Sequence, residues 1–242
     1  MSYINKQPKF KLDYIVMFLL FFTIFSGASQ NSNKDLSINI VTSFDGESIE
    51  KDKWYVTKNN DSIQITKLRF YLTNFVIQTE DKKNDSIFNS NYLIDAFNKE
   101  TLKIILSNTN YNKEDKLLLS IGVNEHLNTS GANSGDLDPS KGMFWSWQSG
   151  YINFKMEGKS PSCKTRKNKF QFHIGGYQKP FESIRVLTFK LSAIKNNELT
   201  ININIAHFFD ALQLSSQNQI MIPGKEANDA ADRLPQLFSI DE

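Results

Sequence analysis

The sequence of 242 residues contains a single cysteine, Cys163, and only three histidines. One thiol cannot form an intrachain disulfide, so the folded chain depends on its apolar core for stability. The sequence also lacks the HExxH pattern of zinc hydrolases, the GxxxxGK loop that cradles phosphates and the GxSxG turn that presents a nucleophile. We expect the three histidines to have no acid–base partner nearby, which would leave little for catalysis. We therefore predict that the protein is not an enzyme.

An excess of charge of one sign is also missing once the N-terminus is set aside. The chain has 28 basic and 26 acidic residues, and residues 1–28 hold three lysines and one aspartate, which leaves 25 of each sign. A net charge of zero gives no electrostatic reason to expect nucleic acid or an anionic membrane surface as a partner. One local basic run contains Lys164, Arg166, Lys167 and Lys169. Because no aromatic residues are interleaved with it, we interpret this run as a solvated loop.

Long hydrophobic runs are absent except near the N-terminus. Three lysines precede the apolar run of residues 15–25, and the small residues Ser26 and Ala28 follow it. This order is typical of a secretory signal peptide, and we predict cleavage after Ala28, with a retained N-terminal anchor as the alternative. The run is shorter than the roughly 20 residues that a membrane span needs, so no membrane insertion is expected after cleavage. The mature protein is expected in the periplasm, outside the cell or at the cell surface.

The mature chain, residues 29–242, is predicted to be one domain made mostly of strands, because no repeat or Pro/Ser-rich linker divides it. Residues 36–44 and 62–79 alternate between apolar and polar side chains, and similar runs recur along the chain with turn signals between them. No βαβ rhythm is present. We predict an all-β fold, an antiparallel β-sandwich with short C-terminal helical segments at residues 207–212 and 224–238. Pro235 should end or kink the second segment.

Four segments, taken in order, resemble the MbnP-like family of secreted copper-binding proteins, the methanobactin-associated periplasmic protein type. They are LRFYLTNFVI, GDLDPSKGMFWSWQSGYINFKMEGKS, CKTRKNKFQFHIGGY and QNQIMIPGK. The resemblance implies a β-sandwich-like domain in the periplasm or at the surface of a bacterium. It also implies copper bound by histidines and by a tryptophan oxidised to kynurenine. The family pattern often has a histidine in its first strand, where this sequence has Thr42, so one expected ligand is missing.

Copper is therefore the expected metal partner, in a role in copper acquisition or handling. The candidate ligands are His173, Trp147, Trp145 and His126. Cu(I) favours imidazole and soft sulfur ligands over carboxylate, and tryptophan becomes a useful ligand only after oxidation opens its ring. His126 is expected to approach from a loop that follows a strand. Met143 and Cys163 are further soft atoms in the same region of the sequence.

A hairpin over residues 144–177 would bring several of these candidates together. Side chains alternate between the two faces of a strand, so Trp145, Trp147 and Tyr151 would share one face if no bulge intervenes. Tyr151 would then lie opposite His173 on the neighbouring strand. The other face would hold the core residues Ile152, Phe154, Phe170, Phe172 and Ile174. Glycines at positions 150, 175 and 176 allow a bulge or a close backbone approach.

Each candidate also has a structural interpretation. His173 would hydrogen-bond a backbone carbonyl within a sheet, and the tryptophans would cover a sheet face. Asp136 and Asp138 suggest calcium, although Asp-x-Asp-Pro is also common in turns. The alternative function is a secreted, non-catalytic binding module for a glycan or a protein partner. Its aromatic patch would consist of Trp145, Trp147, Tyr151 and Tyr177.

Overall fold

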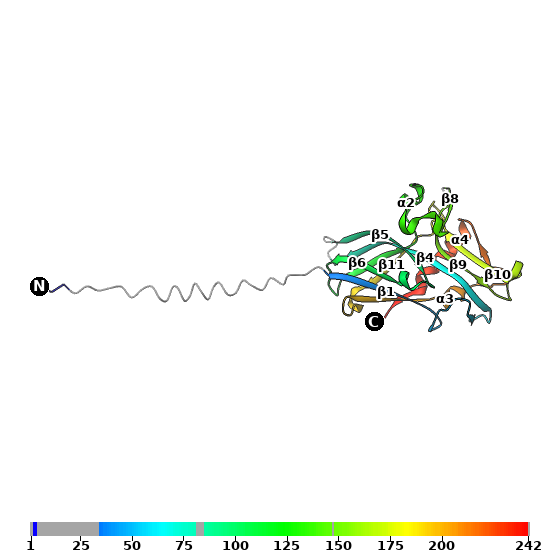
Figure 1. Ribbon diagram of the computed structural model, residues 1–242, viewed down its shortest axis with the longest axis horizontal. Coiled ribbons are helices and arrows are strands. Elements are labelled where there is room, and N and C mark those ends of the chain that lie inside the picture. Colours follow the sequence, from blue (N-terminus) through cyan, green and yellow to red (C-terminus); the bar gives the residue numbers. More distant parts are fainter. Residues whose placement is uncertain (1, 4–33, 81–84, 147, 242) are drawn as a thin grey trace. The chain divides into compact units, whose positions relative to one another are not determined.

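The computed structural model describes residues 2–3, 34–80, 85–146 and 148–241 (Figure 1). The chain from Lys34 onward forms one compact unit. The predicted signal peptide, residues 1–28, lies almost wholly outside the described residues and stays a prediction. No helix in the described part of the chain is long and apolar enough to cross a membrane.

Over the described residues, the chain forms a smaller five-stranded sheet and a larger nine-stranded sheet. The smaller sheet consists of β1 (Lys34–Phe44), β2 (Glu47–Ser48), β6 (Lys103–Thr109), β12 (Glu198–Asn204) and β14 (Phe238–Ile240). Its order is β14-β12-β1-β2, and β6 also pairs with β1.

The larger sheet has the order β11-β7-β4-β9-β10-β13, while β3 and β5 also pair with β4, and β8 pairs with β9. Its strands are β3 (Trp54–Val56), β4 (Ser62–Gln78), β5 (Ser86–Asp95), β7 (Lys116–Ile121), β8 (Phe144–Ser146), β9 (Gly150–Lys159), β10 (Lys169–Gly175), β11 (Arg185–Lys190) and β13 (Gln219–Ile220). The predicted all-β sandwich is confirmed. Two strand pairs, β1 with β12 and β10 with β13, are parallel, so the sheets are mixed rather than purely antiparallel.

The helices are short. They are α2 (Glu125–Thr129), α3 (Ala206–Phe209) and α4 (Lys225–Ala231), with the 3-10 turns η1 (Lys99–Leu102), η2 (Gly135–Leu137), η3 (Pro139–Lys141), η4 (Arg166–Asn168), η5 (Leu191–Ala193) and η6 (Leu234–Leu237). Both predicted C-terminal helical segments are present, as α3 and as α4 followed by η6. Pro235 lies in the first turn of η6, after α4 has ended, as a residue without a backbone N–H should. The helix α2 was not expected, because the sequence predicts a loop there.

The two sheets share one apolar core. Ile38 of β1 belongs to the same buried cluster as Phe70 of β4 and Phe154 of β9, because apolar side chains alternate along each strand. Phe70 meets Phe238 of the smaller sheet edge-on, with ring centroids 5.8 Å apart. Phe208 of α3 stacks on Phe154 at 5.7 Å. The large aromatic side chains therefore fill the space between the sheets.

A second apolar cluster lies on the face of β4 that points away from this core. We call residues 122–146, which cover it, the cap. Tyr71 of β4 and Tyr151 of β9 meet edge-on, with ring centroids 5.8 Å apart, and both are buried. The Tyr71 hydroxyl donates to the Asp136 carbonyl at 3.0 Å, and the Tyr151 hydroxyl donates to the Leu137 carbonyl at 2.8 Å. Two buried tyrosine side chains therefore connect the cap to the larger sheet by hydrogen bonds.

The cap begins at a glycine that has no room for a side chain. Gly122 has a φ of 111°, and a Cβ added there would lie 2.5 Å from Cγ of Asn153. Asn153 is itself fixed, because its Oδ1 accepts from the Val123 N–H at 2.9 Å and its Nδ2 donates to Ser183 Oγ at 2.9 Å. Glycine is the residue that tolerates both the positive φ and the close approach.

Removal of the Phe154 ring should strongly destabilise the sandwich. Phe154 is fully buried and packs on Phe70 and Phe208, so Phe154→Ala leaves a cavity between the sheets and should cost about 3–5 kcal/mol. Urea unfolding would measure this loss. The control is Val186→Ala on the exposed face of β11, which should change stability by less than about 0.5 kcal/mol. Equal losses for the two variants would contradict this assignment of the core.

Candidate functional site

His173 and Glu157 form a histidine–carboxylate pair on the β9–β10 hairpin. Nε2 of His173 lies 2.8 Å from Oε1 of Glu157, and His173 is only 6% exposed. The two residues come from neighbouring strands, in which Gln171 is the direct partner of Glu157 and Lys155 is the direct partner of His173. The histidine thus reaches the carboxylate diagonally across the hairpin. Residues 155 and 157 share its face because side chains alternate along β9.

The expected register of this hairpin is wrong by four residues. His173 lies opposite Lys155 rather than Tyr151. The loop between the strands ends in η4, where Lys167 and Asn168 have positive φ values of 64° and 54°, so the turn is centred further along the chain. The register also shifts at Gly175, as its lack of a side chain allows. Four of the five predicted inward-facing residues do lie in the main core: Phe154, Phe170, Phe172 and Ile174.

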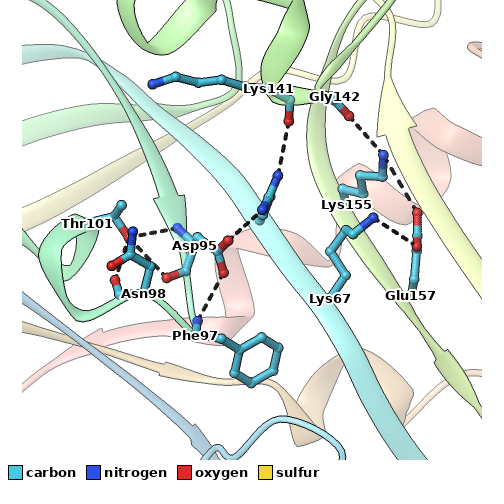
Figure 2. Close-up of polar contacts among 10 residues, drawn as sticks. Lys67, Asp95, Phe97, Asn98, Thr101, Lys141, Gly142, Lys155 and Glu157 are labelled. Atoms are coloured by element: carbon cyan, nitrogen blue, oxygen red, sulfur yellow. Dashed lines mark hydrogen bonds and ion pairs between the residues drawn. The ribbon is translucent and has the colours of Figure 1, made fainter.

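Two lysines flank the Glu157 carboxylate (Figure 2). Nζ of Lys67 lies 3.3 Å from Oε2 of Glu157, and Nζ of Lys155 lies 3.6 Å from Oε1. Lys155 also donates to the Gly142 carbonyl at 2.9 Å. Glu157 therefore holds three positively charged or hydrogen-bonding side chains from three adjacent strands.

The next residue along β4 on this face extends the charged network toward the cap. Nε of Arg69 lies 2.8 Å from Oδ2 of Asp95, and Nη1 of Arg69 donates to the Lys141 carbonyl at 3.0 Å. The Asp95 carboxylate also accepts from the Phe97 N–H at 3.1 Å (Figure 2). Arg69 and Lys155 thus both bond carbonyls at the end of η3. We call Lys67, Arg69, Asp95, Lys155, Glu157 and His173 the charged cluster.

The environment of the cluster shifts the pKa values of Glu157 and Lys155. The hydrogen bond with His173, together with the charges of Lys67 and Lys155, lowers the pKa of Glu157 to about 2, although burial acts in the opposite direction. Burial is the main cause of a lowered pKa at Lys155, and the neighbouring Glu157 charge offsets only part of that effect. Glu157 is therefore an anion throughout the neutral range.

Trp145 lies on a short strand of its own. The chain reverses between β8 and β9, where Phe144 pairs with Tyr151 and Ser146 pairs with Gly150, so the expected continuous strand with one shared aromatic face is wrong. Gly150 has a φ of 72°, which permits this reversal. The Trp145 ring instead packs over Gly175, where an added Cβ would lie 2.7 Å from Cζ3. The close approach predicted for Gly175 is thus present. Trp147 lies outside the described residues.

His126 lies on α2 rather than on a free loop. The Asn124 side chain caps α2 by accepting from the Leu127 N–H at 3.0 Å, and His126 points outward as an exposed residue. Asn128 on the same helix accepts from the Tyr151 N–H at 2.7 Å, which ties α2 to the start of β9. His126 therefore has a fixed place on the cap.

The two soft sulfur atoms are not accessible. Met143 is fully buried in the second apolar cluster, and Cys163 is fully buried in the main core rather than in an open loop. Burial raises the pKa of the Cys163 thiol to about 11. Neither sulfur is placed to reach a metal from solvent.

The two aspartates that suggest calcium have structural partners. Asp136 accepts from Lys141 Nζ at 2.6 Å and from the Leu93 N–H at 2.9 Å. Asp138 caps η3 by accepting from the Ser140 N–H at 2.8 Å. These carboxylates hold the cap together, as turn chemistry predicts.

The remaining candidates are dispersed. Nδ1 of His207 lies 3.1 Å from Oδ2 of Asp210, far along the chain from the charged cluster, and Thr42 is buried in β1 opposite Ile203. Among the described residues, no three histidine, cysteine, aspartate or glutamate side chains gather closely enough to hold a metal ion.

Sequence reasoning missed Glu157 and Lys155 as partners of His173. The signal was available, because the assignment of Phe154 to the core places residues 155 and 157 on the opposite face of the same strand. Because the predicted hairpin register was wrong by four residues, it did not place these side chains next to His173.

The stabilising effect of Glu157 should disappear in acid. Its folded pKa of about 2 lies below the ordinary value of 4.5, so between these values the unfolded chain binds more protons than the folded chain. The contribution is present at neutral pH and is lost as the pH falls from about 5 toward 2. In urea unfolding, the stability difference between the wild type and Glu157→Gln should shrink over this window, with Glu114→Gln at an exposed site as control. A difference independent of pH would contradict this account.

Comparisons with known proteins agree with the fold. The family model named MbnP matches residues 33–222, and no significant match exists among curated protein sequences. The solved structure of MbnP from Methylosinus trichosporium is similar, with a TM-score of 0.64 and 14% sequence identity, and the likeness covers 86% of this chain and 98% of that chain. That identity supports the fold alone. Because the family model covers most of the sequence, the chain belongs to the MbnP family.

Proposed function

We propose that this chain is an exported, non-catalytic copper-handling protein in which His173 is the principal copper ligand. The proposal rests on family membership, on the copper binding that the sequence resemblance implies, and on one observation at the site. That observation is the bond between Nε2 of His173 and Glu157 at 2.8 Å. The site of action would be the periplasm or the cell surface.

The Glu157 bond gives His173 the arrangement that metal-binding histidines usually have. A ligating histidine commonly donates its second ring N–H to a carboxylate, which fixes the tautomer and the ring orientation. With Nε2–H directed at Glu157, a neutral His173 ring has its lone pair at Nδ1. Among the described residues, no hydrogen bond occupies Nδ1.

The charges around His173 favour a monovalent ion. Three cations, Lys67, Arg69 and Lys155, outnumber two carboxylates in the charged cluster. Because Coulomb repulsion scales with ionic charge, Cu(II) would be repelled about twice as strongly as Cu(I). Cu(I) also prefers imidazole to carboxylate ligands. The same positive surplus argues for weak binding unless a further ligand contributes.

A tryptophan oxidised to kynurenine would supply that further ligand. Trp145 packs over Gly175, two residues beyond His173 on β10, so its ring lies at the same end of the strand. Trp147 remains the alternative. His126 would be an additional donor from the exposed side of α2.

A second candidate function, a binding module for a glycan or a protein partner, is supported by a pocket next to the β8–β9 turn. Tyr177 and Phe181 line it, together with Gln148 and Pro223. Tyr151, one member of the expected aromatic patch, is buried and cannot stack on a ligand. The aromatic surface of this module is therefore smaller than the sequence predicts.

Replacement of His173 should abolish copper binding. We expect exported wild-type protein produced with copper to carry the metal and a kynurenine, and His173→Ala to carry no metal. Glu157→Gln should weaken binding roughly 10- to 100-fold, because it removes the carboxylate that orients the ring. Elemental analysis, intact mass and a Cu(I) competition titration would measure these effects.

The matched control is His207→Ala, since His207 has its own carboxylate partner in Asp210 but lies outside the charged cluster. It should leave copper binding unchanged. Wild-type protein that carries neither metal nor modified tryptophan would exclude the copper function. Tryptophan fluorescence that shifts with glycans would then favour the binding module.

A further inference from the structure

The loop that joins β9 to β10 carries positive charge that no acidic side chain balances. Lys164, Arg166 and Lys167 lie in the loop, Lys159 and Lys169 are the strand residues that flank it, and all five are exposed. Within the described part of the chain, none of the five forms an ion pair, whereas other lysines such as Lys53 and Lys58 do. We call these five residues the basic tip. The predicted mature chain has a net charge of zero, so the basic tip is a local excess of positive charge.

The loop of the basic tip is closed by its own hydrogen bonds. The Ser160 N–H donates to the Asn168 carbonyl at 2.8 Å, and the Cys163 N–H donates to the Ser160 carbonyl at 3.0 Å. The Asn168 side chain donates to the Cys163 carbonyl at 2.9 Å. Cys163 is buried in the core and anchors the loop from beneath. Hydrogen bonds therefore hold the backbone that carries Lys164, Arg166 and Lys167.

One of these cations occupies a costly backbone conformation. Lys167 has a φ of 64°, a region that glycine or asparagine adopts more readily than lysine. Such conformations persist where the surrounding structure enforces them, and they cluster at functional sites. The loop thus presents Lys167 outward in spite of the backbone cost.

An exposed tryptophan lies in the same row of the sheet as Lys159 and Lys169, the two residues of the basic tip that belong to strands. Trp54 pairs with Gln64, Gln64 pairs with Lys159, and Lys159 pairs with Lys169. Directly paired residues project from the same face, and strands lie about 4.8 Å apart, so the row spans roughly 15 Å. Trp54 is 52% exposed, and Val56 on the same face of β3 is 63% exposed. The basic run has no aromatic residue within it, but the fold places Trp54 of β3 next to it.

Acidic residues next to this surface are few. Asp61 accepts a hydrogen bond from Ser162 in the loop, and Asp52 lies two residues before Trp54. The other nearby carboxylates are already paired: Glu157 with Lys67 and Lys155, and Glu47 and Glu50 with Lys53. Even with Asp52 and Asp61 counted against the five cations, the surface keeps a positive excess. A partner would therefore need to be anionic.

We propose that the basic tip, with Trp54 and Val56, docks on anionic lipid headgroups as a peripheral membrane contact. Lysines and arginines near a membrane surface are attracted to anionic lipids, and a tryptophan ring is stable at the level of the headgroups. Val56 favours lipid over an acidic polysaccharide or a nucleic acid, because a lipid interface offers an apolar phase to an exposed aliphatic side chain. This contact is independent of the copper site, since His173 is buried in a different row of the sheet.

Vesicle co-sedimentation of the exported protein tests the proposal. Vesicles that contain phosphatidylglycerol should bind the wild type, pure phosphatidylcholine vesicles should not, and high salt should weaken the binding. The triple variant Lys164→Gln, Arg166→Gln, Lys167→Gln should lose roughly 100-fold in affinity for the anionic vesicles. Trp54→Ala should also weaken vesicle binding, and thermal unfolding of each variant would verify its fold.

The matched control neutralises the same number of exposed, unpaired lysines elsewhere, as Lys99→Gln, Lys103→Gln, Lys190→Gln. It should bind anionic vesicles as the wild type does. The proposal is overturned if the wild type does not bind these vesicles, if it binds both lipids equally, or if the two triple variants behave alike. Binding to alginate or DNA without binding to vesicles would also overturn it, in favour of an acidic polymer as partner.

Discussion

Burial of β4 and β9 on both faces is the constraint on which the rest of the structure depends. The inner faces of these strands supply Phe70 and Phe154 to the core between the sheets, while Tyr71 and Tyr151 point outward. Exposure of these two phenol rings to water would cost hydrophobic free energy, so the cap covers them. Backbone carbonyls of the cap accept the hydrogen bonds that the two hydroxyls donate. The close contact of Gly122 with Asn153 starts the cap at the correct place. The shape of the region around Trp145 follows from this requirement.

Where the cap ends, the same face of the sheet becomes charged, and Glu157 organises it. Its carboxylate is an anion at neutral pH and holds two lysines and a histidine, and these contacts lower its pKa to about 2. Lys155 and Arg69 in turn bond carbonyls at the end of η3, so the charged cluster also secures the cap. Support of the cap and placement of His173 are thus properties of one network. Any change at Glu157 is expected to affect both.

The sequence contained enough information for the sandwich, because period-two alternation in segments such as residues 62–79 reports directly which face is buried. The aromatic core residues of β9 and β10 follow from the same pattern. The relative positions of Trp145, Tyr151 and His173 do not, because they depend on a reversal at Gly150 and on a loop that shifts the hairpin register by four residues. Asparagine at position 168 is compatible with a positive φ, but nothing in the sequence indicates that Lys167 adopts one. The proximity of Trp54 to Lys159 cannot be predicted without knowledge of the order of the strands in the sheet.

The burial of Cys163 has a further chemical consequence. Only the thiolate attacks disulfides or is readily oxidised, and a thiol with a pKa of about 11 is almost entirely protonated near neutral pH. With no accessible surface, it also cannot meet a second thiol. A chain with one cysteine would otherwise be liable to cross-link with other proteins in an oxidising compartment. Because the Cys163 side chain of the β9–β10 loop is buried in the core, the folded protein is inert to thiol exchange.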